Sequence, residues 1–219
     1  MSTTKINSLC GLALMLAGVS VALWPLTHPW GSVAGADIGR SGQWMVAHTF
    51  HFLAALFGLL GLLGLVEREV KTARAFERVA FLLAFVGTIL FAGSGVFTAF
   101  LWPVLARNAP ALTELQGPFF SPPHPLILVT TISYSLGYIL LGIALVRAHA
   151  LAQWGAIALV LGAFLLMIPP APLSPLPWIV FPTGACCSAL AWSRWGLRSK
   201  APLGLRELRS QRRAACALL

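Results

Sequence analysis

The sequence is poor in charge, and poorest in negative charge. Asp, Glu, Lys and Arg make up 10% of its 219 residues, whereas a soluble domain has roughly 25%. Its six acidic residues are Asp37, Glu67, Glu69, Glu77, Glu114 and Glu207. None of them lies inside a long apolar run. A carboxylate in mid-membrane is the usual mark of a proton or cation pathway, and the sequence offers none.

Cysteine chemistry is also missing. The cysteines are Cys10, Cys186, Cys187 and Cys216. No two of them have the spacing of a zinc site, and they suggest no disulfide framework. Cys186 and Cys187 are neighbours in an apolar segment, which is typical of small buried residues. Because no catalytic motif is present either, the sequence favours a protein that is not an enzyme, with a membrane-embedded enzyme as the alternative.

Long apolar runs take the place of charge. Hydrophobic residues make up 58% of the chain, and its mean hydropathy is +0.84. A soluble fold of this size could not cover so much apolar surface, so lipid must be the solvent for much of it. Six runs are near the length that crosses roughly 30 Å of hydrocarbon, namely 8–26, 44–66, 79–105, 126–146, 151–168 and 178–195. We therefore predict an all-α, polytopic transmembrane bundle of six helices within residues 1–195.

The distribution of basic residues predicts the orientation of the bundle. With the N-terminus inside, only Arg40 and Arg107 of the 15 Lys and Arg residues fall on the outer side. Such an excess marks cytoplasmic loops, so both termini are predicted to be inside, with the plasma (inner) membrane as the location. The outer ends of the runs also carry tryptophans, which prefer the interface, at Trp24, Trp30, Trp44, Trp102 and Trp178.

The first run has an alternative interpretation as a signal peptide. Lys5, a short apolar stretch and Ala34-Gly35-Ala36 have the order of a leader with a cleavage site. A long, bulky spacer that contains Trp30 speaks against it. Cleavage would leave five helices with the N-terminus outside.

The net charge of +9 points to lipid rather than nucleic acid, because the basic residues stand beside apolar runs. Residues 196–219 form a basic cytoplasmic tail. Leu205, Leu208 and Ala215 fall near one side of it, which favours an amphipathic helix on anionic lipid, with a disordered positive tail as the alternative. The ending Cys216-Ala217-Leu218-Leu219 also matches a prenylation box, although a protein with six spans needs no lipid anchor.

Small residues at helical spacing predict close helix packing. They are Gly58, Gly61 and Gly64 in the second run, Ala80, Ala84, Thr88 and Ala92 in the third, and Gly184 and Ser188 in the sixth. Small residues let helix backbones approach closely in a membrane. Such faces favour a compact bundle, and they could also hold a homo-oligomer or a membrane complex together.

Four histidines lie toward the outer side. His48 and His51 share one helix face, and Ala55 and Gly58 on that face predict that it packs against another helix. His28 precedes a proline in a predicted outer loop, where solvation explains it. The alternative without a function is that His48 contacts lipid headgroups and His51 forms a hydrogen bond with a neighbouring helix.

Further polar residues lie at a depth comparable to that of His51. The third run contributes Ser94 and Thr98, and the fourth is the most polar of the six. Together they predict an outward-facing polar pocket between helices two, three and four. Its predicted ligand-binding residues are His48, His51, Ser94, Thr98, His124, Thr131, Ser135 and Tyr138.

The leading hypothesis is a membrane protein that binds or conducts a small polar ligand or a proton through this pocket. The second is an accessory or scaffolding subunit without chemistry of its own. No cofactor is expected, and the third hypothesis is haem or a divalent metal at His48, His51 and His124. That case is weak because no carboxylate lies near the first two histidines in the sequence.

Overall fold

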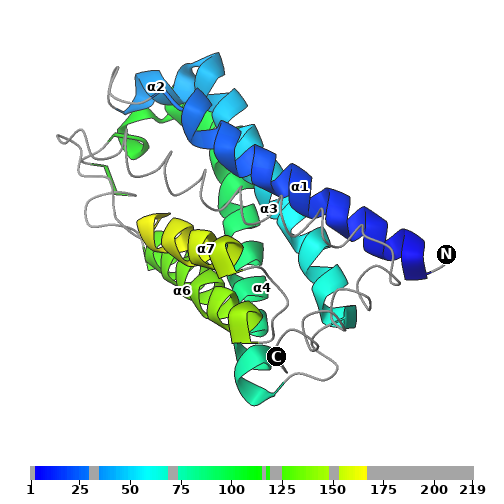
Figure 1. Ribbon diagram of the computed structural model, residues 1–219. Helices are drawn as coiled ribbons and strands as arrows, with labels where there is room; N and C mark the ends of the chain where they lie inside the picture. The colour runs from blue at the N-terminus through cyan, green and yellow to red at the C-terminus, as the bar shows by residue number, and fades with distance from the viewer. Residues whose placement is uncertain are drawn as a thin grey trace, which may run out of the picture.

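The structure is a computed structural model, and it describes residues 3–29, 35–68, 74–114, 117–118, 125–147 and 153–166. All regular elements in these ranges are helical (Figure 1). They are α1 (Thr3–Thr27), α2 (Ala36–Arg40), α3 (Gly42–Arg68), α4 (Ala75–Val96), the π-helix η2 (Phe97–Leu101), α5 (Trp102–Asn108), the 3₁₀ turn η3 (Pro110–Leu112), α6 (Pro125–Arg147) and α7 (Gln153–Leu166). The all-helical prediction is therefore confirmed for the described residues.

Four helices are long and apolar enough to cross a membrane. These spans are Leu9–Thr27, Gly42–Gly64, Ala75–Asn108 and Pro125–Arg147. The third span runs through α4, η2 and α5, and its 34 residues extend about 50 Å at roughly 1.5 Å per residue. The fifth predicted run is described as α7, with 14 residues. The sixth run, 178–195, and the tail, 196–219, lie outside the described residues.

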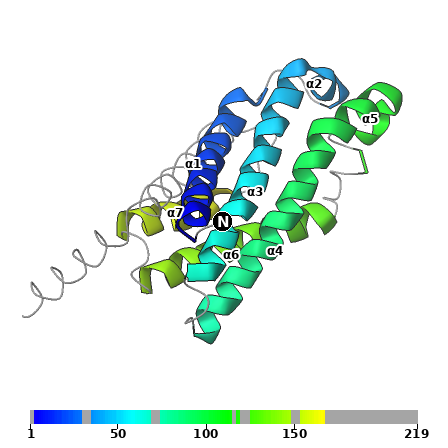
Figure 2. The ribbon, with the colours of Figure 1, turned by 90° about the vertical axis from the view of Figure 1, so that its right-hand side faces the viewer.

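The helices pack in the order in which they follow one another along the chain. α1 contacts α3, α3 contacts α4, α4 contacts α6, and α6 contacts α7. Figure 2 shows α2 and α5 side by side at one end of the bundle, and these two elements are in contact. We refer to this end as the α2 end. α1 finishes there, and α3 starts there.

The small-residue faces predicted in the second and third runs lie on α3 and α4, at helix contacts inside the bundle, and the third predicted face, Gly184 and Ser188, lies outside the described residues. A Cβ atom at Gly61 would overlap the side chain of Leu14 on α1. On the other side of the bundle, a Cβ at Gly87 would lie 2.6 Å from the backbone of Tyr134, and one at Gly137 would lie 2.6 Å from the backbone of Ala84. The glycines therefore allow α4 and α6 to touch backbone to backbone.

A wide helical turn precedes Pro103 in the third span. The N–H of Trp102 bonds to the carbonyl of Phe97, five residues back, instead of to Thr98 as in an α-helix. Five residues after Thr98 comes Pro103, which has no N–H to donate. The Thr98 carbonyl thus loses its usual main-chain donors, and the indole Nε1 of Trp44 donates to it at 2.8 Å.

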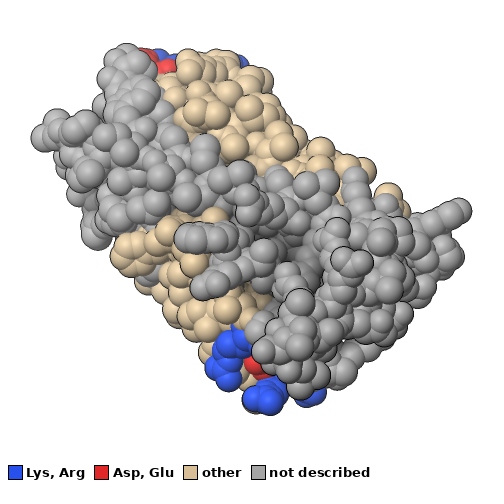
Figure 3. Space-filling view, viewed as in Figure 1, with Lys and Arg blue, Asp and Glu red and all other residues tan. Residues whose placement is uncertain are grey.

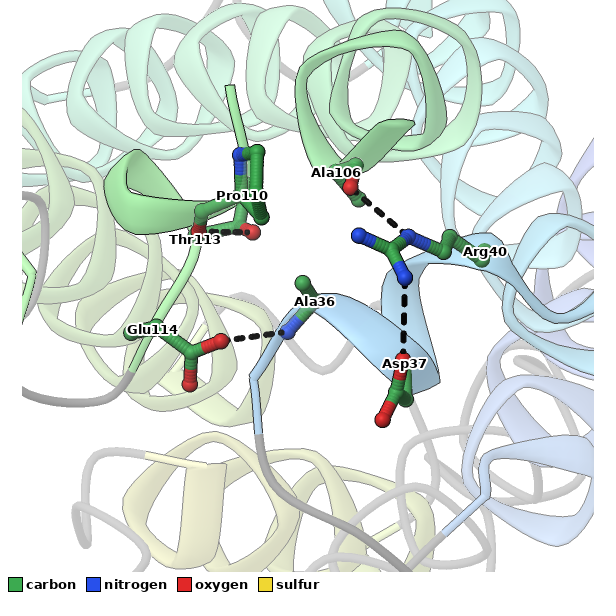
Figure 4. A network of polar contacts seen from close by, with 7 residues as sticks. All are labelled: Ala36, Asp37, Arg40, Ala106, Pro110, Thr113 and Glu114. Atoms are coloured by element: carbon green, nitrogen blue, oxygen red, sulfur yellow. Dashed lines mark hydrogen bonds and ion pairs between the residues drawn. The ribbon is translucent and has the colours of Figure 1, made fainter. Parts of the chain in front are cut away.

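Polar contacts tie α2 to the end of the third span (Figure 4). Arg40 donates from Nε to the carbonyl of Ala106 at 2.8 Å and forms an ion pair with Asp37 at 3.1 Å. The N–H of Ala36 donates to a carboxylate oxygen of Glu114 at 3.4 Å. These contacts attach the link between α1 and α3 to α5, and so they fix where both helices meet the third span.

Candidate functional site

Three histidine rings come together where α1 ends and α3 begins. The rings of His28 and His48 have centroids 5.3 Å apart, and those of His48 and His51 are 5.8 Å apart. His48 and His51 are each 5% exposed, so the prediction that His51 faces the bundle interior is confirmed. The expectation that His28 is a solvated loop residue is wrong. It is half-buried, and burial lowers the pKa of its imidazole to about 4.

Large aromatic rings surround the histidines. Trp44 lies 4.1 Å from His48, and Trp24 lies 4.7 Å from His51, between ring centroids. The ring of Phe91, on α4, lies 4.0 Å from His51. The histidines are therefore held in an apolar, aromatic environment formed by α1, α3 and α4. Such an environment weakens competition from water and strengthens each hydrogen bond that is made.

The contacts of Ser94 determine where the proton of His51 lies. The Ser94 hydroxyl donates its single proton to the carbonyl of Phe91 at 2.8 Å. Its oxygen also lies 3.4 Å from Nε2 of His51, and it can only accept there. From this hydrogen-bond network we assign the ring proton of neutral His51 to Nε2. In a neutral imidazole, Nδ1 is then a bare acceptor.

That acceptor is buried and unused. Within the described part of the chain, Nδ1 of His51 has no hydrogen-bond partner, and neither ring nitrogen of His48 has one. Leaving a buried polar group without a partner costs about 1–3 kcal/mol. Three such nitrogens lie on two neighbouring rings, so several hydrogen bonds are missing in one place, and a bound molecule could supply them.

The predicted pocket residues on α6 form a separate group. The hydroxyl of Thr88 donates to the carbonyl of Ala84 at 2.6 Å, so the Tyr138 hydroxyl donates to Thr88 at 2.8 Å. The ring of Phe91 stacks on Tyr134 at 4.3 Å between centroids. Phe91 also contacts His51, so its ring lies between the histidines and the two tyrosines, Tyr134 and Tyr138.

The structure thus divides the eight predicted residues. His48, His51 and Ser94 belong to one cluster, and Thr98 joins it through its carbonyl and Trp44. Tyr138 pairs with Thr88 instead. The remaining α6 residues are Thr131, which is half-buried, and Ser135, which is 1% exposed and has no partner for its hydroxyl in the described chain. His124 lies outside the described residues.

Sequence reasoning missed the aromatic part of the cluster. Trp24 and Trp44 were assigned to the membrane interface, and Phe91 and His28 were not considered part of the site. A signal was available, because Trp24-x-x-x-His28 and Trp44-x-x-x-His48 repeat the same spacing. Residues four apart are neighbours on a helix, so Trp44 could have been placed beside His48, where the structure has it.

The described residues contain no group of three His, Cys, Asp or Glu side chains arranged to hold a metal ion. His124, which the metal and haem hypothesis needs as its third histidine, is not among them. No family model matches this chain, and no curated protein or solved structure matches it either. A proposal for the function of this chain must therefore rest on the chemistry of the histidine cluster.

Proposed function

We propose that this chain is a multi-pass protein of the plasma membrane that binds a small, uncharged molecule at His48 and His51. The observation that carries the proposal is the set of buried ring nitrogens without partners. Buried polar groups in proteins are nearly always hydrogen-bonded. Two adjacent exceptions on one helix face are best explained by a ligand that completes their bonds.

The surroundings favour a neutral ligand over a cation. Asp37 pairs with Arg40, and Glu114 bonds the N–H of Ala36, so both carboxylates are already engaged at the α2 end. With no free carboxylate among the described residues there to balance it, a bound cation would have only the ring faces of Trp24, Trp44 and Phe91 to offset its lost hydration. A neutral molecule avoids that cost.

The tautomer of His51 restricts the ligand further. Its Nδ1 is an acceptor, so the ligand must carry a hydroxyl or an N–H that donates to it. Trp24, Trp44 and Phe91 supply ring surfaces that suit a flat or apolar body. Because Phe91 stacks between His51 and Tyr134, the arrangement favours binding at the cluster over conduction of a ligand or proton through it.

Phenol and benzene provide a matched test, because they differ only in the hydroxyl. Calorimetric titration of the full-length protein in lipid nanodiscs measures both, with empty nanodiscs as the correction for partition into lipid. We expect phenol to bind about tenfold more tightly than benzene, because its hydroxyl adds one hydrogen bond of roughly 1–1.5 kcal/mol. The preference should vanish in His51→Phe and persist in Thr131→Val. Equal binding of the two compounds, or unchanged phenol binding by His51→Phe, refutes the site.

The orientation proposed for the six helices has both termini in the cytoplasm. In support, the described arginines outside α2 and α5 gather at the opposite end of the bundle (Figure 3), where Arg74, Arg78 and Arg147 are exposed. Reporter fusions after residues 72 and 199 should report cytoplasm, and a fusion after residue 115 should report the outside. A cytoplasmic signal at residue 115 contradicts the proposal.

The scaffolding alternative rests on the small-residue faces and the basic tail, of which Gly184, Ser188 and the tail lie outside the described residues. Gly61, Gly87 and Gly137 all contact neighbouring helices of the same chain. Ala80 and Ala84 are fully buried in the same bundle. These small-residue faces are therefore occupied internally, which favours the binding proposal. If the titration shows no preference for phenol over benzene, the scaffolding subunit becomes the better account of this protein.

A further inference from the structure

The contact between α4 and α6 sets a register that places two arginines at one level. Gly87 packs against Tyr134, and Gly137 packs against Ala84. The two helices therefore run antiparallel, and each step back along α4 matches one step forward along α6. Continued toward the start of α4, this register brings Arg74 level with Arg147.

The contacts of Arg147 agree with that register. Its guanidinium carbon lies 5.1 Å from the centroid of the Phe76 ring, two residues after Arg74. A guanidinium that rests on an aromatic face is held in place, while its N–H edge stays available for hydrogen bonds. That edge can bind a phosphate through two parallel bonds.

Charge at this end of the bundle is not balanced by the described residues. Arg74 and Arg147 are exposed, and neither of them forms an ion pair within the described ranges. Arg68 and Arg78 also belong to this end, with Glu67 and Glu77 as the carboxylates there, so four arginines face two carboxylates among the described residues. Figure 3 shows this group of basic side chains at the end where α4 begins. The site therefore calls for an anion.

The surface next to the arginines identifies the kind of anion. Val79 and Leu82, on the following turns of α4, are each 60% exposed, and Ile143 on α6 is 40% exposed. Along each helix these side chains lie on the membrane side of the arginine level, since Val79 and Leu82 follow Arg74 on α4 and Ile143 precedes Arg147 on α6. We propose that Arg74 and Arg147 bind the phosphate of an anionic phospholipid, whose acyl chains lie along this α4–α6 surface.

Lipid retention by the purified full-length protein tests this site. The protein is exchanged into mixed micelles with phosphatidylglycerol or phosphatidylcholine, and the bound lipid is counted by native mass spectrometry. The double variant Arg74→Gln, Arg147→Gln is compared with the wild type and with Arg107→Gln, which removes a charge near the α2 end. The basic tail is the same in all three proteins, so its lipid binding cancels.

We expect phosphatidylglycerol to be retained in preference to phosphatidylcholine. Each arginine should contribute about fivefold to the affinity, since a basic residue near an anionic surface is worth ~1 kcal/mol. The double variant should lose this preference, and Arg107→Gln should keep it. Equal retention by the wild type and the double variant overturns the site. Displacement of phosphatidylglycerol by millimolar inorganic phosphate would overturn the lipid assignment, because a free-anion site would then explain the arginines.

Discussion

The indole Nε1 of Trp44 donates a hydrogen bond to the main-chain carbonyl of Thr98 at 2.8 Å. This bond connects a proline on one helix to the histidine site on another. In the π-helical turn, the residue whose N–H would bond to the Thr98 carbonyl is Pro103, which has no N–H. The carbonyl therefore has no main-chain donor, and the indole of Trp44 donates to it instead. The same indole ring lies 4.1 Å from His48, so the wide turn helps to place the aromatic surroundings of the histidines.

Replacing Trp44 with Phe should destabilise the protein and report on this bond. Phe keeps an aromatic ring beside His48 but removes the N–H donor, so the Thr98 carbonyl is left unsatisfied at a cost of about 1–3 kcal/mol. In a Pro103→Ala background the N–H of residue 103 can serve that carbonyl. The loss caused by Trp44→Phe should then be smaller.

Unfolding of the four proteins in detergent, arranged as a double-mutant cycle, measures this coupling directly. A Trp44→Phe penalty of the same size in both backgrounds would show that the indole acts only through ring packing. The proposed link between the proline and the histidine site would then be lost.

The α4–α6 contact predicts a strong contrast between glycines on one helix. Gly87→Ala places a Cβ against the backbone of Tyr134, which cannot move aside as a side chain could. We expect a loss of at least about 1–3 kcal/mol, as in other overpacked interiors. Gly93→Ala is the matched control, because a Cβ at Gly93 meets nothing within 4 Å. Its thermal stability should equal or exceed that of the wild type, and similar losses in both variants would refute the contact.

His28 should titrate far below an ordinary histidine. Burial lowers its pKa from 6.5 to about 4, because the charged imidazole would lose its hydration. The unfolded chain binds this proton near pH 6.5 and the folded chain near pH 4, so the contribution of His28 to stability is full above pH 6.5 and decreases as the pH falls toward 4. An NMR titration of histidine-labelled protein, assigned with His28→Gln, measures the value. A pKa near 6.5 would place His28 in solvent.

The sequence predicted the features of the fold that depend on helix periodicity. Gly61, Gly64 and Ala84 belong to the small-residue faces predicted from the sequence, and all three lie at helix contacts in the structure. His51 faces inward because Ala55 and Gly58 share its face. Such inferences require only the knowledge of which face of a helix carries small residues, and no other knowledge of the tertiary arrangement.

Features that depend on which helices are neighbours could not be predicted in this way. The sequence grouped His51 with Thr131 and Tyr138 by depth alone. In the structure, Trp24 of α1 and His28 just after it join the cluster, and Phe91 separates the tyrosines from it. Depth fixes a position along the membrane normal and leaves the angle around the bundle open. The bond from Trp44 to Thr98 was equally out of reach, since it requires the π-helical turn.

The central claim is that Nδ1 of His51 is an acceptor kept for a ligand, and ¹⁵N NMR of histidine-labelled protein in lipid bilayers tests it most directly. The two ring nitrogens give separate signals that show which one carries the proton, with His51→Phe as the assignment control. The account predicts that Nε2 is protonated, that Nδ1 is bare, and that phenol moves the Nδ1 signal upfield while benzene leaves it unchanged. A protonated Nδ1, or a Nδ1 signal that saturating phenol does not move, would contradict the account.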